Sequence, residues 1–574
     1  MTNTEKIYQM KKMYQMKLWM LAAVLMCGFG LLLTSCSDND NEPNGNGDDN
    51  LAGQVVLMYY AIGGGNLDDD TEEALANMGL TLANDNRVRT FVQYKYSAER
   101  NNTSWDDNYQ PSGEYGSVYR FELNSSSINP YYKGLVKNAK AFAGPGFTKF
   151  AGKDFKMYEP DNLTQFVNWC MAQAPGAKAY VLAFGDHGGA YNLRKDYNKA
   201  LKTKALTRGV MYDDNLSGEP CMSPAEIASA LDKVTRKPDM IYFDCCLMNN
   251  LEVLGELQGR TQYVFASGHS VMQGPLYELG NALAGVASSS NVSQGLRAYM
   301  SNFVSTITQV MEKRYKNRTG NRIRRSQDYT LTDMSKLPAL FASIKAVTDF
   351  LAAVDISGYD REKFNQAASG CYQYVDSRPF FDILGYLNQL KENVFTDNAE
   401  FASLVAQVKT AAEACHVAHG EFSYDKDGTN RKYGLTYSVT LGFSSKCFSY
   451  INEKVQAKAP AEPVGVIMYT IRGGKGTGAD PYYNDYYFEN GDNFLASWVE
   501  GQEYNIINID RYWASDSGDH LSWDNSYRTM QFDKATGWSR WMKKNPGIHF
   551  DNPPYDDEYT YVIEDPDWSE ILDE

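Results

Sequence analysis

Two short stretches of the sequence each end an apolar run in a residue that could take part in acyl transfer. The first, AKAYVLAFGDHGG, places His187 and two glycines just after strand-forming residues. The second, DMIYFDCC, places Cys246 in the corresponding position after a later run. A cysteine thiolate attacks a carbonyl carbon, and a nearby imidazole can remove the thiol proton and later protonate the leaving amine. The two residues therefore predict nucleophilic chemistry, provided that the fold brings them together.

Backbone amides near these residues could stabilise the oxyanion of a tetrahedral intermediate. The amides of Gly188 and Cys246 are the candidates, and a glycine at 188 lets a substrate backbone approach closely. A single histidine at a strand end is usually a surface residue, and a cysteine after an apolar strand usually belongs to the core. Their matching positions at two strand ends favour the catalytic interpretation. Cys245 is the alternative nucleophile, and His269 is a weaker candidate for the base.

The elements that must position these residues alternate between short apolar strands and amphipathic helices. This pattern is typical of an α/β fold with a mostly parallel sheet and helices on both faces. Ligands of such sheets bind beyond the carboxyl ends of the strands, where His187 and Cys246 are expected to lie. The predicted strands are 54–60, 88–96, 177–185, 239–245 and 261–267, and the predicted helices are 71–84, 162–174, 223–234 and 249–257.

The second half of the chain is predicted to contain helices first and strands later. Beyond residue 350 the pattern indicates an additional α+β region that extends to the carboxyl end. The predicted elements are helices at 291–313, 336–354, around 361–393 and at 399–418, and strands at 328–334, 433–443 and 463–473.

The amino-terminal segment has the features of a targeting signal. Lysines precede the apolar stretch LWMLAAVLMCGFGLLLTSC, whose end resembles a bacterial lipobox with Cys36 as the lipidated residue. A membrane-spanning helix is the alternative, but the small residues before Cys36 favour processing. We therefore predict a lipoprotein signal peptide over 1–36 and a flexible acidic tether over 37–50, because the tether has almost no apolar side chains.

An acidic run directly after such a cysteine resembles the surface-export signal of Bacteroidetes lipoproteins. The expected location is the outer membrane, held by a lipid anchor at Cys36, with the protein at the cell surface or, alternatively, facing the periplasm. The formal net charge of −16 and the pI near 5.0 exclude a typical nucleic-acid partner, since binding phosphates needs a cationic face. Beyond the leader and lipobox, seven cysteines remain, without the spacing of a metal site or a dense disulfide framework.

The two motifs resemble those of a known peptidase family. FGDHGG at His187 and YFDCCLMNNLEV at Cys246 are similar to the two catalytic motifs of the clostripain family of cysteine peptidases. VVLMYYAIGGGNLDDD near the start and YRTMQFDKATGWSRWM at 527–542 are similar to further family segments. The resemblance implies a caspase-like fold and a dyad of His187 and Cys246. With the pattern of elements, this predicts a peptidase domain over 51–350 and a carboxyl-terminal α+β region over 351–574.

The resemblance also implies protein or peptide substrates, cleaved after arginine or lysine. Asp244 matches an acid of the family's specificity pocket, although a structural carboxylate is the plainer interpretation. A second acid is expected after the next strand, but 267–277 contains none before Glu278. Basic specificity is therefore less firmly predicted than peptidase activity.

Relatives are cut by their own activity in a loop that corresponds to 193–214. An exposed basic loop is the alternative interpretation of that segment. The chemistry itself requires no cofactor. Calcium is possible, because some family members are associated with it and acids cluster at 63–70, but no complete calcium loop identifies metal ligands. The candidate residues for self-cleavage are Lys199, Lys202, Lys204 and Arg208.

A second class of function is a surface-tethered lipoprotein that binds glycans or proteins and keeps a peptidase fold without its chemistry. The 41 tyrosines motivate this alternative. The sequence favours the enzyme, because both positions of the dyad are occupied.

Overall fold

The computed structural model describes most of the chain between Gln54 and Lys544. The leader, the tether, the self-cleavage candidates and the strand predicted at 463–473 lie outside the described residues. The chain divides into two compact units, Met1–Asp49 and Asn50–Glu574, and all described residues belong to the second. In this described part, no helix is both long and apolar enough to cross a bilayer. The described residues are 54–82, 85–99, 109–134, 139–191, 209–216, 220–271, 276–319, 325–360, 363–364, 366–367, 370–372, 374, 380–424, 432–441, 497–499, 502–504 and 529–544.

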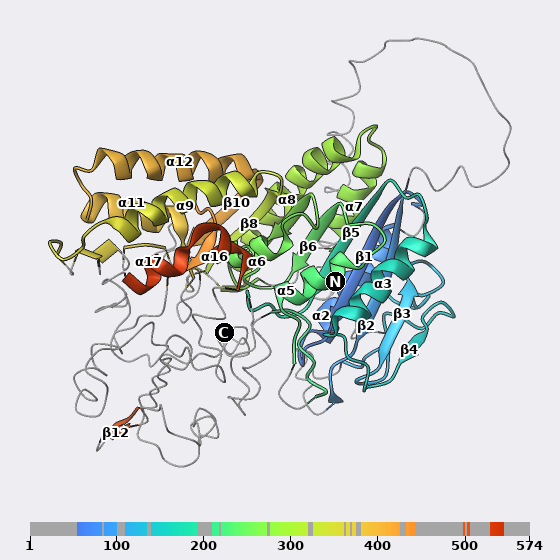
Figure 1. The fold of residues 1–574 in the computed structure, drawn as a ribbon. Helices are drawn as coiled ribbons and strands as arrows, with labels where there is room; N and C mark the ends of the chain where they lie inside the picture. Colours follow the sequence, from blue (N-terminus) through green and yellow to red (C-terminus); the bar gives the residue numbers. More distant parts are fainter. Residues whose placement is uncertain are drawn as a thin grey trace, which may run out of the picture. The chain divides into compact units, whose positions relative to one another are not determined.

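A nine-stranded sheet forms the centre of the described unit, in the order β10-β8-β7-β6-β5-β1-β2-β3-β4. The five strands from β7 to β2 are parallel, whereas the strands at each edge are antiparallel to their neighbours. The predicted α/β class with a mostly parallel sheet is confirmed. The strands are β1 Val55–Ile62, β2 Val88–Lys95, β3 Val118–Glu122, β4 Lys149–Ala151, β5 Ala179–Gly185, β6 Met240–Asp244, β7 Tyr263–Ala266, β8 Arg325–Asp333 and β10 His416–Tyr424 (Figure 1).

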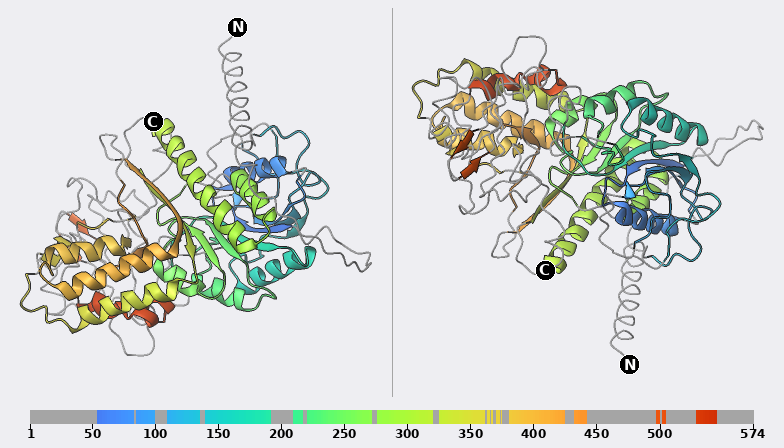
Figure 2. Two further views of the ribbon diagram at one scale, coloured as in Figure 1. Left: turned by 90° about the horizontal axis from the view of Figure 1, so that it is seen from above. Right: turned by 90° about the horizontal axis from the view of Figure 1, so that it is seen from below.

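Helices cover both faces of this sheet (Figure 2). Every residue of β1 is fully buried, because its alternate side chains enter two different apolar cores. Val56, Met58 and Tyr60 share one core with α3 Pro160–Gln173, α5 Pro224–Asp232, α6 Leu251–Leu257 and α9 Leu337–Ala353. Leu57 and Tyr59 share the other with α2 Asp68–Leu82, α7 Leu276–Ala287 and α8 Val292–Thr319. Burial on both faces explains why these strands are continuously apolar in the sequence.

Residues beyond 350 contribute to the same sheet. The helix predicted at 399–418 ends at Cys415 as α12 Ala399–Cys415, because the chain continues as strand β10, which pairs with β8. The predicted helix around 361–393 is described as α11 Ile383–Asn393, which begins where the Asp382 carboxylate accepts the Gly385 amide at 2.8 Å. Asp382 ends the short strand β9 Phe380–Asp382, and β9 pairs with β11 Ser438–Thr440. The predicted boundary between domains at residue 350 stays a prediction.

The described residues 529–544 form two short helices, α16 Gln531–Thr536 and α17 Trp538–Lys544, which overlap the family-like segment 527–542. Both pack against α9, and α16 also packs against α6. The Trp538 indole donates to the carbonyl oxygen of Thr440 at 2.8 Å and is fully buried. The carboxyl-terminal part of the described chain thus buttresses the helix that follows Cys246.

Candidate active site

The carboxyl ends of β5 and β6 lie side by side. The two strands are parallel neighbours, and Gly185 pairs with Asp244 at their ends. The amide of Asp186 continues this pairing by donating to the carbonyl oxygen of Asp244 at 3.4 Å. The chain segments that carry His187 and Cys246 therefore leave the sheet at the same edge.

Gly188 lies against the backbone of Cys246. A Cβ atom at position 188 would be only 2.0 Å from the carbonyl oxygen of Cys246 and 2.5 Å from its amide nitrogen. Only glycine permits such an approach. The structure thus brings together the predicted site residues His187, Gly188, Asp244 and Cys246.

The backbone is strained around this contact. Three residues other than glycine have a positive φ in the described part of the chain, and all three lie near it. Leu247 follows Cys246 and has a φ of 66°, and Ala190 lies three residues after His187 and has a φ of 62°. Met211 has a φ of 64°. It lies two residues after Gly209, whose carbonyl oxygen accepts the amide of Gly189. Strain of this kind persists only where surrounding contacts fix the backbone, and it concentrates at functional sites.

The two adjacent cysteines have different surroundings. The thiol of Cys245 is buried and donates to the carbonyl oxygen of Phe184 at 3.4 Å. Burial raises the pKa of Cys245 well above its ordinary value, and the carboxylates of Asp186 and Asp244 raise it further. Cys246 is partly exposed, and its sulfur accepts the amide of Val271 at 3.3 Å. Because a thiolate is the attacking species, the partial exposure of Cys246 favours it over the buried Cys245 as the predicted nucleophile.

Asn66 is a site residue that the sequence analysis missed. Its Oδ1 atom lies 2.8 Å from Nε2 of His187. An amide oxygen only accepts hydrogen bonds, so Nε2 is the donor in this contact. Asn66 belongs to GGGNLDDD, which the sequence analysis considered only for calcium. The signal that could have found it is its place just beyond the end of β1, the strand next to β5.

Replacing Asn66 with alanine is expected to lower kcat for peptide hydrolysis roughly 100-fold, toward the lower limit of what general acid–base catalysis contributes. The imidazole would lose the contact that fixes its tautomer and orientation. Asn77→Ala, on the following helix, is the matched control and should leave kcat unchanged. Equal kcat values for the two variants would remove Asn66 from the site.

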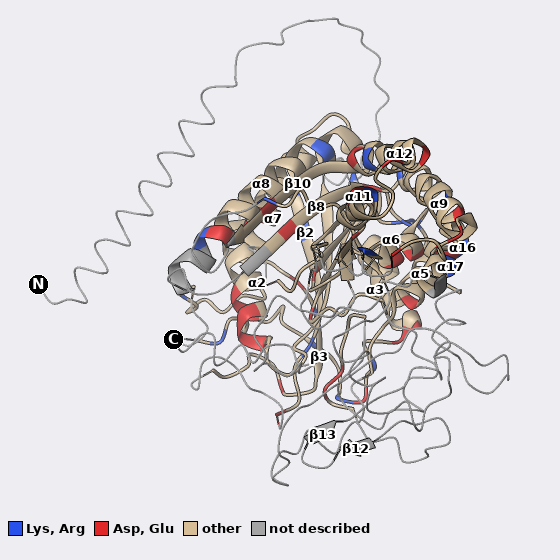
Figure 3. Ribbon diagram, turned by 90° about the vertical axis from the view of Figure 1, so that its left-hand side faces the viewer, with Lys and Arg blue, Asp and Glu red and all other residues tan. Residues whose placement is uncertain are grey.

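Hydrogen bonds to Ser97 and Asp68 hold the loop that carries Asn66. The amide of Gly65 donates to the Ser97 hydroxyl at 2.9 Å, and the Ser97 amide donates to the Asp68 carboxylate at 3.3 Å. Tyr94 donates to Asp68 through its hydroxyl, and burial raises the pKa of Asp68 to about 6 despite these hydrogen bonds. Asp68 opens the acidic first turn of α2 (Figure 3).

The acids of this stretch accept hydrogen bonds within the fold. Glu72 accepts from the Tyr96 hydroxyl and from the amide of Ser112, and Asp69 accepts the amide of Asp70 at 3.0 Å. Across the part of the chain that the structure describes, no group of three or more His, Cys, Asp or Glu side chains could hold a metal ion.

A buried ion pair holds the segment that follows residues 192–208. Nζ of Lys95 lies 2.7 Å from Oδ2 of Asp213, and neither side chain is exposed. The Asp186 carboxylate accepts the amide of Tyr212 on the same segment at 2.6 Å. Burial raises the pKa of Asp186 well above its ordinary value, although backbone hydrogen bonds lower it.

His269, the weaker candidate for the base, lies just beyond β7 and is buried. Its Nδ1 is 2.7 Å from Asp328 Oδ1, and its Nε2 is 2.7 Å from the Tyr372 hydroxyl. Both ring nitrogens are therefore engaged within the fold, which favours His187 over His269 as the base.

Comparison with known proteins identifies the family. The clostripain family (peptidase C11) matches residues 132–543, a span that includes both motifs and the segment 527–542. No curated protein matches the sequence closely enough to count as a relative.

Several solved structures are similar to the chain. A secreted C11 cysteine protease of Bacteroides thetaiotaomicron, "iotapain", is 16% identical over 67% of this chain and 92% of its own, with a TM-score of 0.43. The same bacterium's secreted C11 protease in complex with an irreversible peptide inhibitor is 15% identical over 67% and 92%, with a TM-score of 0.42. An inactive zymogen C11 protease of Parabacteroides distasonis is 15% identical over 71% and 96%, also with a TM-score of 0.42. Because the family match covers most of its length, the chain belongs to the clostripain family of cysteine peptidases.

Proposed function

We propose that the chain is an endopeptidase that uses Cys246 as nucleophile and His187 as general base and acid. The sulfur attacks the scissile carbonyl carbon, and the imidazole takes the thiol proton and passes it to the leaving amine. Water then hydrolyses the thioester, which regenerates the thiol and releases the acid. The amides of Gly188 and Cys246 donate to the oxyanion in both steps. The observation that carries this proposal is the close approach of Gly188 to the Cys246 backbone.

Cleavage after arginine or lysine is the proposed specificity. Asp244 supports it, because its carboxylate lies two residues before Cys246 at the end of β6 and is largely buried. A buried carboxylate is stabilised by a cationic side chain that enters beside it. The segment after β7 offers no second acid before Glu278, so Asp244 is the principal carboxylate of the proposed pocket.

Self-cleavage within 193–214 is the proposed route of activation, after Lys199, Lys202, Lys204 or Arg208. These four residues lie outside the described residues. Support comes from the described part of the segment, since the amide of Gly189, two residues after His187, donates to the carbonyl oxygen of Gly209 at 2.9 Å. Gly209 thus lies next to the stretch of chain that carries the proposed base.

The proposed location is the outer membrane, with a lipid anchor on Cys36 and the peptidase at the cell surface or, alternatively, in the periplasm. This proposal rests on the lipobox and the acidic tether alone. The proposed partners are the membrane and protein or peptide substrates. Calcium has no assigned ligand, and the proposed chemistry proceeds without a cofactor.

Affinity labelling separates this function from a tethered binding protein with a peptidase fold. We expect a peptide chloromethylketone that ends in arginine or lysine to alkylate Cys246, because its thiolate displaces chloride. The modified peptide is mapped by mass spectrometry, and a chloromethylketone that ends in aspartate is the control for specificity. A binding protein without an activated thiolate would take up neither reagent.

A further inference from the structure

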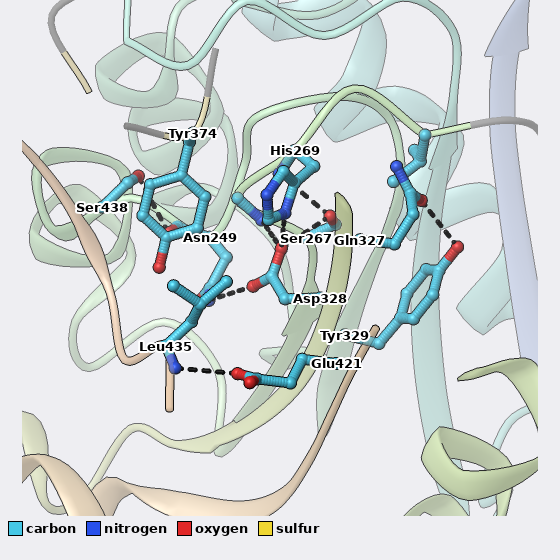
Figure 4. Close-up of polar contacts among 12 residues, drawn as sticks. Asn249, Ser267, His269, Gln327, Asp328, Tyr329, Tyr374, Glu421, Leu435 and Ser438 are labelled. Atoms are coloured by element: carbon cyan, nitrogen blue, oxygen red, sulfur yellow. Dashed lines mark hydrogen bonds and ion pairs between the residues drawn. The ribbon is translucent and has the colours of Figure 1, made fainter. Parts of the chain in front are cut away.

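A buried carboxylate, Asp328, lies among polar side chains that include Ser267, His269 and Asn249 (Figure 4). Asp328 lies on β8 and is fully buried. Its Oδ1 atom accepts from the Ser267 hydroxyl at 3.0 Å, from the Gly268 amide at 2.8 Å and from Nδ1 of His269 at 2.7 Å. Its Oδ2 atom accepts from the Asn249 amide group at 3.2 Å. One side chain thus joins the loop after β7 to the turn after β6.

The hydrogen bonds keep this carboxylate ionised inside the protein. Burial alone would raise the pKa of Asp328, but the hydrogen bond from His269 and the nearby charges of His269 and His419 hold the pKa below its ordinary value. The Gly268 amide lowers it further. Hydrogen bonds to an ionised group are stronger than neutral ones, so the loop is held firmly.

The loop after β7 in turn contacts the turn that carries Cys246. Four hydrogen bonds join them, and two are between backbone atoms. The strained φ of Leu247 needs such support. The contacts are Leu247 N to His269 O at 3.0 Å, Asn249 N to Ser267 O at 2.8 Å, Val271 N to Cys246 Sγ at 3.3 Å and Cys246 Sγ to Val271 O at 3.7 Å.

We propose that Asp328 and His269 are positioning residues for the nucleophile. They fix the loop 267–271, and this loop fixes both the backbone of Leu247 and the sulfur of Cys246. The inference rests on the proposed function, since it concerns the same thiol. His269 is then a positioning residue, and neither the base nor a residue of the specificity pocket. This role accounts for a histidine at the place where the family resemblance predicts an acid.

Variants of the full-length protein test this role. Asp328→Asn keeps the shape but removes the charge, and His269→Ala removes the donor to Asp328. Both should lower kcat about 10- to 100-fold while KM stays within about threefold, because misplacement of the nucleophile affects the reacting atoms more than binding. His269→Asn restores a donor near the position of Nδ1 and should recover most of the loss. The substrate is a fluorogenic peptide amide that ends in arginine, and iodoacetamide alkylation of Cys246 is measured in parallel.

Asp533→Asn is the matched control. Asp533 is also buried and accepts from the Ser539 amide at 2.7 Å and its hydroxyl at 2.8 Å, far along the chain in α16. It should lower thermal stability without changing kcat or the alkylation rate. If Asp328→Asn does not fold, the two His269 variants decide the matter.

Two outcomes would overturn the inference. In the first, the kcat of Asp328→Asn or of His269→Ala is no lower than the kcat of Asp533→Asn. In the second, the kcat of His269→Asn is as low as that of His269→Ala. The alkylation rate distinguishes this failure from failure of the proposed function. A wild-type protein that cuts no peptide would refute the function, whereas alkylation of Cys246 that is about tenfold slower in the variants would still support the positioning role.

Discussion

Replacing Cys246 with serine is expected to lower kcat/KM for peptide hydrolysis by roughly 10⁴-fold or more, whereas Cys245→Ser should change it by less than about threefold. The reason lies in the surroundings of the two thiols. Cys246 is partly exposed beside Gly188, and Cys245 is buried with its thiol on the carbonyl oxygen of Phe184. A serine at 245 can make the same donation, so the core there should keep its hydrogen bond.

The measurement is steady-state hydrolysis of a peptide amide by both variants, with circular dichroism to verify folding. Each variant is the control for the other, because the substitution is the same and the positions are adjacent. The opposite result, in which Cys245→Ser is inactive and Cys246→Ser is active, would reassign the nucleophile. Equal loss in both variants would indicate a change in the strand end rather than loss of a reacting group.

The sequence carried enough information to predict the sheet and the ends of its strands. Strands such as β5 and β6 are buried on both faces, so they appear as apolar runs whose ends are marked by charged residues and glycines. His187 and Cys246 could be proposed because each comes directly after such a run. The register that pairs Gly185 with Asp244 could not be predicted, because it depends on contacts between distant segments.

Other parts of the fold and site depend on tertiary contacts alone. The helix predicted at 399–418 overlaps the first residues of β10, since HVAHGEFSY has little strand signal apart from its pairing with β8. Asn66 and Asp328 were missed because their partners, His187 and His269, are remote in sequence. Asp328 in particular lies within a strand, where a charged residue usually indicates exposure, yet here the fold buries it completely.

Gly188→Ala is the second variant with a large expected effect. The added Cβ would meet the carbonyl oxygen of Cys246 at 2.0 Å and its amide nitrogen at 2.5 Å. These atoms belong to the backbone, so no flexible side chain can move away, and the segments that carry His187 and Cys246 must separate. Because the displaced amides are the proposed oxyanion donors, kcat should fall by about 10²- to 10³-fold.

The control for this variant is Gly152→Ala, where an added Cβ meets nothing within 4 Å. That change should leave both kcat and thermal stability near the wild-type values. Gly188→Ala should also lower the free energy of unfolding by about 1–3 kcal/mol, since the core must adjust to the extra atom. If the added Cβ separates the two segments, the rate of affinity labelling of Cys246 should fall together with kcat. A Gly188→Ala protein with wild-type kcat would show that the strand ends can move apart without cost, and the dyad would then lose its main support.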